Sequence, residues 1–431
     1  MSMFFRLLLL LGLFCMPMQA AQQCLVIGDS LTKEYEVEFP ALFPQNPDSW
    51  SARNWAEILH EHRNTWFDLG RFSGYVDPRL TGHEHNWAFP GATTAEIKDQ
   101  LDHFGWLYSE LEGQLKDAAE RVVIFAGGND VDSYYGQIYN GASPTNYING
   151  TRDNLKWIVN YVRGVKSSVP IVLVSVPHLG CAPDVQRQYP TDPVKTARVT
   201  AALDSLNAQL ATFAQSKGIG FVPGVYQFTK DIIEGPFRIG GIEFYKEADL
   251  DSRARYAFSG DGFHPATSAH GKIAQMVIEA FLTKYPGTKI TPLTDKEIVS
   301  DILGLNPDIP FQEWIATQGL PAGKKGLLDD PDGDGLTNGV EFLLEGALAS
   351  VPSRELWQPQ VEAVGPDQFL TFTYSLRTIA SEWASSKTQQ SGDLLQWTDV
   401  DSSHITSHLD GSQTVRLPLL GRQFLRLKVE P

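Results

Sequence analysis

The sequence predicts an α/β fold built on a doubly wound parallel sheet, followed by a small antiparallel β domain. Between residues 24 and 285, short apolar runs alternate with amphipathic helical patterns, which is typical of parallel β-α-β units. Beyond residue 285 this rhythm stops, and residues 355–431 show alternating strand patterns with a hairpin turn at Asp410-Gly411. We therefore expect four parts, at 1–21, 22–285 (the α/β domain), 286–350 (a linker with short helices) and 351–431 (the β-rich domain).

The elements of the α/β domain can be placed from its pattern of apolar residues. Clear strands are predicted at 24–28, 122–126 and 171–176, and weaker ones at 65–69 and 219–222. Helices are predicted at about 50–62, 93–118, 146–166, 194–217 and 268–284.

Two aromatic-rich stretches, 32–48 and 224–258, do not fit the alternation of strands and helices. We expect both to be loops near the strand ends. Aromatic residues in such loops often form the wall of a pocket, although they can equally serve only to pack the loops against the domain.

The composition excludes one class of partner. The chain has 431 residues, of which 42% are hydrophobic and 20% charged, as is ordinary for a globular protein with a substantial core. Its formal net charge of −16 argues against a nucleic-acid partner, which requires a basic face.

The N-terminus resembles a secretory signal peptide. Arg6 precedes an apolar run over 7–15, and the small residues Ala20-Ala21 follow. The run is shorter than the ~20 apolar residues that a membrane-spanning helix needs. We therefore expect removal of residues 1–21 and export of the remaining chain, with no membrane span.

The cysteines of the exported chain are expected to be free thiols. Cys15 lies in the predicted signal peptide, which leaves Cys24 and Cys181. Cys24 opens one predicted strand, whereas Cys181 follows the end of another. The two thiols should therefore lie at opposite ends of a parallel sheet.

Polar side chains follow the ends of two predicted strands. Ser30 comes directly after the strand at 24–28, and Asn129 follows the strand at 122–126. Because the carboxyl ends of parallel strands meet at one edge of a sheet, both residues should lie where such sheets bind ligands. A serine there can act as a nucleophile if a base reaches it, and an asparagine amide can donate to an oxyanion.

Two further segments supply the groups that such a serine needs. In the loop 261–265, Asp261 and His264 lie three residues apart, so the imidazole can reach Ser30 while the acid orients it. Gly91 lets a substrate approach the backbone closely, and its N–H is a second candidate oxyanion donor. The alternative is that these residues serve structure alone, in turns, loop braces and helix caps.

Taken in order, the segments Gly28-Asp29-Ser30-Leu31, Gly91, Gly127-Gly128-Asn129-Asp130 and 261–265 resemble the motif blocks of the GDSL or SGNH hydrolase family, over about residues 24–284. The resemblance implies a flavodoxin-like three-layer α/β/α sandwich and a serine ester hydrolase that works through an acyl-enzyme, without a catalytic cofactor.

The same resemblance assigns roles to individual residues. Ser30 would be the nucleophile, His264 the base and Asp261 its orienting partner, while the Ser30 N–H, the Gly91 N–H and the Asn129 amide would form the oxyanion hole. The family includes carbohydrate deacetylases, lipases and arylesterases. We therefore expect a small-molecule or polysaccharide ester as substrate, with a lipase or arylesterase activity as the alternative.

The segment 330–341 fits a twelve-residue calcium-binding loop of the EF-hand type. Gly335 at its sixth position permits the sharp turn. The expected ligands are Asp330, Asp332, Asp334, the Leu336 carbonyl, Asn338 and a bidentate Glu341. Because no helix is predicted directly before the loop, a structural Ca²⁺ is more consistent than a sensor, and the alternative is an acidic surface turn without an ion.

The alternative to an enzyme is a protein without catalytic activity that has the same calcium loop and β domain. The chain would then be a calcium-braced protein for binding or surface attachment, with the C-terminal β domain contacting a glycan or the cell surface. Elsewhere, His83, His85 and His178 are not expected to bind metal, because no carboxylate cluster accompanies them. Asp130 is expected to stabilise its own loop.

Overall fold

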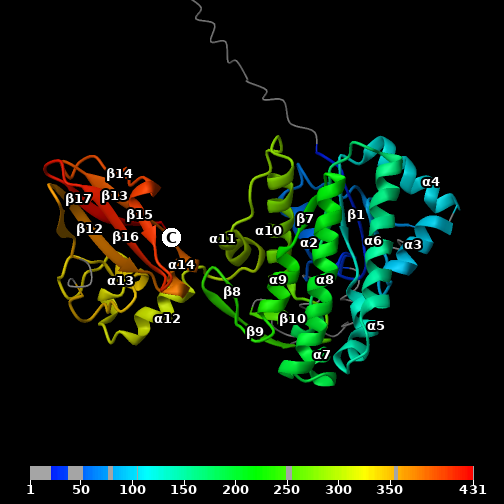
Figure 1. Cartoon of the computed structure of the whole chain (residues 1–431), viewed down its shortest axis with the longest axis horizontal. Coiled ribbons are helices and arrows are strands. Elements are labelled where there is room, and N and C mark those ends of the chain that lie inside the picture. The colour runs from blue at the N-terminus through cyan, green and yellow to red at the C-terminus, as the bar shows by residue number, and fades with distance from the viewer. Residues whose placement is uncertain are drawn as a thin grey trace, which may run out of the picture.

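The computed structural model describes residues 21–36, 52–75, 81–103, 105–248, 255–353 and 358–430. The predicted signal peptide lies outside these residues except for Ala21, and so does most of the aromatic stretch 32–48. Figure 1 shows a larger α/β body and, beside it, a smaller body formed by the C-terminal part of the chain. None of the described helices is both long and apolar enough to cross a membrane.

The larger body is built on a five-stranded parallel sheet, as predicted. Its strand order is β4-β1-β5-β6-β7, and the central strands are completely buried. The strands are β1 Cys24–Gly28, β4 Asn86–Ala88, β5 Arg121–Phe125, β6 Ile171–Val174 and β7 Gly220–Val222.

Helices cover both faces of this sheet and complete a three-layer sandwich (Figure 1). On one face α2 and α10 pack together, and on the other α6 packs against α3 and α8. Apolar residues of α6 recur at helical spacing and are buried against the sheet. The helices are α2 Trp55–His62, α3 Thr94–His103, α4 Gly105–Gly113, α5 Gly128–Tyr139, α6 Thr145–Val165, α7 Pro183–Gln188, α8 Pro193–Lys217 and α10 Thr267–Lys284, with a π-helical turn at Gln114–Ala118 and a 3₁₀ turn at Leu179–Cys181.

The prediction of a strand at 65–69 is wrong. The N–H groups of Trp66 and Phe67 bond back to the carbonyl of Arg63 and close the end of α2, so they cannot join the sheet. Only Asp68 makes an isolated bridge, to Gln23 at the start of β1. The edge of the sheet is formed instead by β4, at 86–88.

The prediction that 224–258 is a loop is also wrong. The segment contains α9 Gly224–Asp231, the antiparallel strands β8 Phe237–Ile239 and β9 Ile242–Ala248, and β10 Tyr256–Phe258. Gly240 and Gly241 both have positive φ, at 55° and 78°, and form the tight turn that joins β8 to β9. A second small sheet pairs β2 Phe72–Gly74 with β3 Thr81–His83.

The segment 286–350 contains short helices, as expected, but it does not run free between two bodies. Ile290, Leu293 and Ile298 are buried in the core of the α/β body. Further along, Phe311 and Phe342 are buried in a separate aromatic core of the smaller body. The helices are α11 Asp295–Glu297, α12 Ile309–Thr317 and α13 Asn338–Leu343, with a π-helical turn at Ile298–Ile302 and a 3₁₀ turn at Ala322–Lys324.

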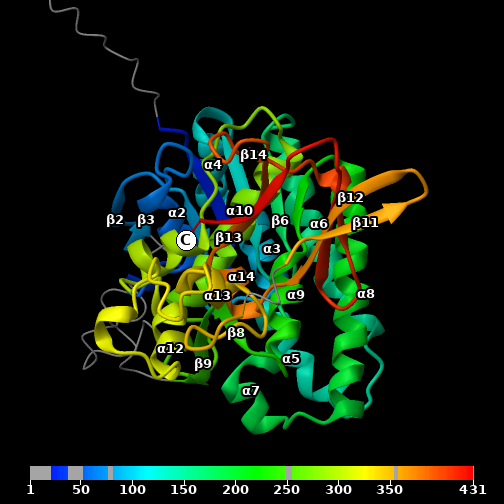
Figure 2. The ribbon, with the colours of Figure 1, turned by 90° about the vertical axis from the view of Figure 1, so that its left-hand side faces the viewer.

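The C-terminal residues form two small antiparallel sheets, which confirms the predicted β domain. The sheets have the orders β11-β12-β16-β15 and β14-β13-β17, and side chains such as Phe372 and Leu417 are buried in their core. Figure 2 shows the hairpin of β11 and β12 extending away from the rest of the body. The elements are β11 Gln360–Val364, β12 Asp367–Ser375, α14 Thr378–Trp383, β13 Ser385–Ser391, β14 Thr398–Asp399, β15 Ile405–Ser407, β16 Ser412–Pro418 and β17 Phe424–Glu430.

The two bodies meet closely at the turn between β8 and β9. A Cβ atom on Gly241 would lie 2.5 Å from the Ile379 carbonyl oxygen of α14 and 3.2 Å from the Pro310 ring of α12. Such an approach is possible only for a residue without a side chain. Gly240, beside it, has more room, since its nearest neighbour would be 3.7 Å away.

Candidate active site

Ser30 lies in a tight turn at the carboxyl end of β1. The carbonyl of Asp29 accepts the N–H groups of Thr32 and Lys33, and its carboxylate accepts the N–H of Leu31 at 3.0 Å. Gly28 is required just before the turn, because a Cβ there would lie 2.3 Å from the Phe125 carbonyl oxygen on β5. The close approach of β1 to β5 therefore fixes where the hydroxyl of Ser30 is presented.

The structure brings His264 and Asp261 to Ser30, as the sequence predicts. His264 Nε2 lies 2.9 Å from Ser30 Oγ, across a sequence separation of 234 residues. The other ring nitrogen, Nδ1, lies 2.5 Å from Asp261 Oδ2. In this arrangement the imidazole can take the serine proton at one nitrogen while the carboxylate holds the other.

Asp261 is held in place by donors other than the imidazole. Its Oδ1 accepts the backbone N–H groups of Phe263 at 2.9 Å and His264 at 3.0 Å, and the hydroxyl of Ser259 at 2.7 Å. Burial raises the pKa of Asp261, but its hydrogen bond and charge interaction with His264, together with these donors, lower it to about 2. The role of Ser259 could not be predicted from the sequence, since nothing marks a hydroxyl two residues before the acid.

Tyr35 packs against the imidazole of His264, and His270 packs against Tyr35. Tyr35 presents its ring edge-on to His264, with 6.3 Å between ring centres, and its hydroxyl lies 2.8 Å from His270 Nε2. Burial, and secondarily the charge of His264, lower the pKa of His270 to about 3, so this second histidine is neutral. Tyr35 belongs to the 32–48 stretch, and sequence spacing did not connect it with His270.

The three predicted oxyanion donors are the N–H groups of Ser30 and Gly91 and the side-chain amide of Asn129. Gly91 has a positive φ of 75°, and neither its N–H nor that of Ser30 has an acceptor among the described residues. Asn129, in the first turn of α5, donates its side-chain amide to the carbonyl of Ala92 at 3.0 Å. This bond holds the amide beside the loop that carries Gly91.

Asp130 stabilises its loop, as predicted, and does so by connecting three helices. Its carboxylate accepts the Thr94 N–H at 2.7 Å and the Thr94 hydroxyl at 2.6 Å, both at the start of α3. It also accepts the hydroxyl of Thr151, on α6, at 3.1 Å. Asp130 therefore fixes the first turn of α5, where Asn129 lies.

An apolar cavity opens beside Ser30 and Asn129. Phe228 and Phe258 lie in its wall, so aromatic residues of the 224–258 segment do line a pocket, although from a helix and a strand. The free thiol of Cys181 also lies in the wall, and that of Cys24 is buried elsewhere in the same core.

The predicted calcium ligands lie far along the chain, in the smaller body. Within the described ranges, the one group of three side chains placed to share a metal ion consists of Asp330, Asp332 and Asp334. His83, His85 and His178 join no such group. His178 instead pairs with Gly180 and Thr200 inside the α/β body.

An α/β body with a hydrogen-bonded serine, histidine and aspartate at one edge of its parallel sheet has the architecture of an ester hydrolase. The model of the GDSL-like lipase/acylhydrolase family matches residues 25–277 of the chain. The chain belongs to this family and is a hydrolase that acts on ester bonds.

Two solved structures resemble the chain, both at low sequence identity. One is the lipase/acylhydrolase from Enterococcus faecalis, which is 14% identical with a TM-score of 0.33, over 63% of this chain and 98% of that chain. The other is a carbohydrate esterase family 3 protein from Talaromyces cellulolyticus, which is 12% identical with a TM-score of 0.33, over 62% of this chain and 100% of that chain. No curated protein matches the chain.

Proposed function

We propose that the protein is an exported serine esterase that removes acyl groups from carbohydrate or other small esters. The observation that carries the proposal is the chain of contacts from Ser30 Oγ to His264 Nε2 at 2.9 Å and from His264 Nδ1 to Asp261 Oδ2 at 2.5 Å. This geometry provides an activated nucleophile at pH 7 without a metal ion.

The reaction proceeds in two halves. Ser30 Oγ attacks the ester carbonyl carbon while His264 Nε2 takes the hydroxyl proton, and the imidazolium then returns that proton to the leaving alcohol. Water next attacks the carbonyl carbon of the acyl-enzyme and gives a proton to His264, which passes it to Ser30 Oγ as the bond between serine and acyl group breaks and the acid leaves. In both halves the negative oxygen lies among the N–H groups of Ser30 and Gly91 and the amide of Asn129, each worth about 3 kcal/mol of barrier.

The cavity beside Ser30 supports an acyl group as the part of the substrate held there. Its wall is apolar, and Phe228 and Phe258 lie in it. Such a wall suits the apolar part of an acyl group.

The test is hydrolysis of p-nitrophenyl esters of increasing acyl length, together with acetate release from acetylated glycans. We expect release of p-nitrophenol and of acetate, and Ser30→Ala to lower kcat by about 10⁶-fold. Ser216→Ala, an exposed serine at the end of α8, is the matched control and should leave activity unchanged.

A fluorophosphonate probe should label the wild type and not Ser30→Ala. Full activity of Ser30→Ala would overturn the mechanism. A preference for long acyl chains would instead support the lipase alternative.

Export and glycan contact are the remaining parts of the proposal. The signal-like residues 1–21 support export, and mass spectrometry of the mature protein should find a chain that begins near Gln22. On the β domain, a surface recess lined by Gln390, Gln396 and Arg422 supports contact with a polar glycan. Gln396→Ala with Arg422→Ala should weaken retention on acetylated polysaccharide, and unchanged retention would rule this surface out.

A further inference from the structure

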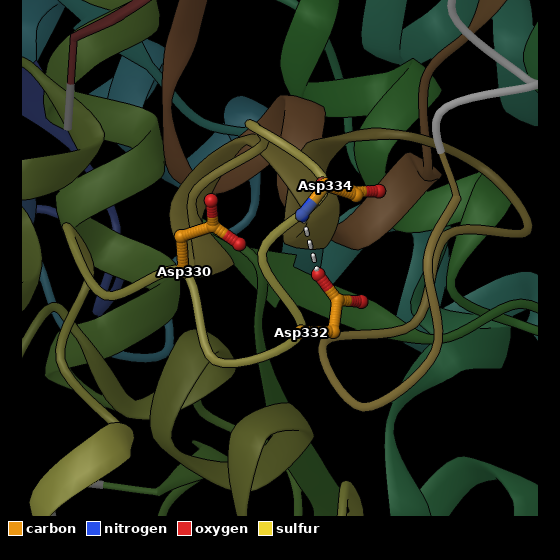
Figure 3. A group of neighbouring side chains, drawn as sticks. All are labelled: Asp330, Asp332 and Asp334. Carbon is orange, nitrogen blue, oxygen red and sulfur yellow. Dashed lines mark hydrogen bonds between the residues drawn. The ribbon is translucent and has the colours of Figure 1, made fainter.

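The acidic loop between α12 and α13 brings three carboxylates together in the smaller body. Oxygens of Asp330, Asp332 and Asp334 lie within 4.8 Å of one another. Figure 3 shows them on one turn of chain, with the Asp334 N–H donating to Asp332. Loop amides account for some of these oxygens, since Asp330 accepts the N–H groups of Gly333 and Gly335.

A fourth carboxylate, that of Glu341, makes the loop more than an acidic turn. Glu341 lies in α13 and is completely buried, and neither of its oxygens has a hydrogen-bond partner. Asn338 Oδ1 and Asp332 Oδ2 are likewise buried without a partner. Unpaired buried carboxylate oxygens are very unfavourable, because water no longer solvates them.

Glu341 lies near enough to the three aspartates for their charges to act on it, and none of the described basic side chains pairs with the group. Within the described parts of the chain, none of the four acids forms an ion pair with a lysine, arginine or histidine. The arrangement therefore has the charge and the unused oxygens of a cation site.

We propose that this loop binds one Ca²⁺ and that the ion holds the smaller body together. Its ligands are the carboxylates of Asp330, Asp332 and Asp334, the Leu336 carbonyl, Asn338 and both oxygens of Glu341. A carboxylate oxygen has two lone pairs, so an oxygen that accepts a loop N–H can still bind the ion. Oxygen ligands in this number, with a bidentate glutamate, suit Ca²⁺ better than the smaller Mg²⁺.

The position of the loop shows why the ion is structural. Leu336 is buried in the core of the β sheets, and Phe342 is buried in the aromatic core with Phe311. Asp334 also accepts the backbone N–H of Ser353 at 2.6 Å, which joins the loop to the segment that leads into the sheets. One ion therefore connects the two cores of the smaller body.

Hydrogen bonds hold the chain segment that leads into the loop. Asn338 Nδ2 donates to the carbonyls of Lys324 and Gly326, and the N–H of Asn338 donates to the carbonyl of Asp329. The element directly before the loop is a 3₁₀ turn, at Ala322–Lys324, and α12 ends well before it. Calcium sensors open by moving one helix against another, and this loop has no entering helix to move.

Calorimetric titration of chelator-treated full-length protein with CaCl₂ tests the proposal. We expect one site per chain, and Ca²⁺ binding at least tenfold tighter than Mg²⁺ binding. Glu341→Gln and Asp332→Asn should each weaken Ca²⁺ binding by about tenfold or more, since each removes a charged ligand. Asp367→Asn removes an exposed acid of the same body at the start of β12 and should not change the affinity.

Thermal unfolding of the same full-length proteins gives an independent readout. Ca²⁺ should raise the unfolding temperature of the wild type and of Asp367→Asn, and should have little effect on Glu341→Gln. Ester hydrolysis should persist in chelator, because no ligand of the ion lies near Ser30. Absence of Ca²⁺ binding by the wild type at millimolar Ca²⁺, or equal binding of Mg²⁺, would overturn the proposal whether or not the esterase assignment holds.

Discussion

At the scale of single residues, the site depends on how firmly Asp261 is held. Four donors converge on its carboxylate: the His264 ring, two backbone N–H groups and the Ser259 hydroxyl. These bonds favour the ionised form and fix the imidazole with its free nitrogen toward Ser30. Asp261 therefore acts as a charged brace whose protonation state does not change under ordinary conditions.

The pH dependence of activity follows from this lowered pKa. Because Asp261 keeps its charge down to about pH 2, its protonation should not contribute to the loss of kcat/KM at mildly acidic pH. Asp261→Asn should lower kcat by about 10⁴-fold, because the amide no longer secures the correct tautomer. The exposed Asp117→Asn is the control, and an unchanged kcat in Asp261→Asn would contradict the prediction.

The same group contributes to the pH dependence of stability. Its folded-state pKa is lower than the ordinary value of 3.8, so its contribution is complete above that value and is lost as the pH falls toward about 2. Urea unfolding of wild type and Asp261→Asn should therefore differ most at neutral pH. The difference should shrink in acid, which separates this effect from a simple loss of packing.

At the scale of secondary-structure elements, Asp130 joins the starts of α3 and α5 to the middle of α6. Asp130→Ala removes three hydrogen bonds and leaves the Thr94 N–H at the start of α3 without its acceptor. We expect a loss of about 2 kcal/mol in the free energy of unfolding, measured by urea denaturation. Activity should also fall, because Asn129 lies in the same turn.

A matched control lies on the same helix. Asp132 is exposed on α5, two residues beyond Asp130. Asp132→Ala should therefore change neither stability nor activity appreciably, and an equal effect of the two substitutions would contradict the role given to Asp130.

Elements with a strong local pattern of apolar residues could be predicted from the sequence. Elements for which two segments could take the same place in the sheet could not. Burial on both faces marked β1, β5 and β6 as continuous apolar runs. By contrast, 65–69 and 86–88 both offer short apolar runs for one edge of the sheet. The segment 65–69 does not form the edge strand, because two of its backbone N–H groups already bond to the end of α2. The pattern of apolar residues does not reveal these bonds.

The site was easier to predict than its surroundings for the same reason. Ser30, Asn129 and His264 each follow or precede an element that the pattern identifies, so their common edge could be inferred. Ser259 and Tyr35 act through contacts across the fold, to Asp261 and to His270. No spacing in the sequence encodes such contacts.

At the scale of the whole molecule, the fit of the two bodies depends on Gly241. Gly241→Ala should push the turn between β8 and β9 away from Ile379, because the added Cβ would lie 2.5 Å from the carbonyl oxygen of that residue. Small-angle X-ray scattering should then show a larger radius of gyration, while ester hydrolysis should be little changed because Ser30 lies elsewhere in the α/β body.

Gly240→Ala is the matched control for this substitution. Both glycines have positive φ, so both alanines carry the strain of a left-handed conformation, about 1–2 kcal/mol. Only Gly241→Ala adds the clash between the bodies. Equal scattering from the two variants would mean that the contact at Ile379 does not hold the bodies together.

The separation of 234 residues between Ser30 and His264 also sets when the protein becomes active. Ribosomes add about 5–20 residues each second, so the nucleophile exists for many seconds before its base has been made. During that time the chain carries an ordinary serine hydroxyl, unable to react with the esters it meets. The protein therefore becomes active only when the first strand and the last helix of the α/β body have folded together. A chain that is cleaved between them, and whose two parts separate, has no activity.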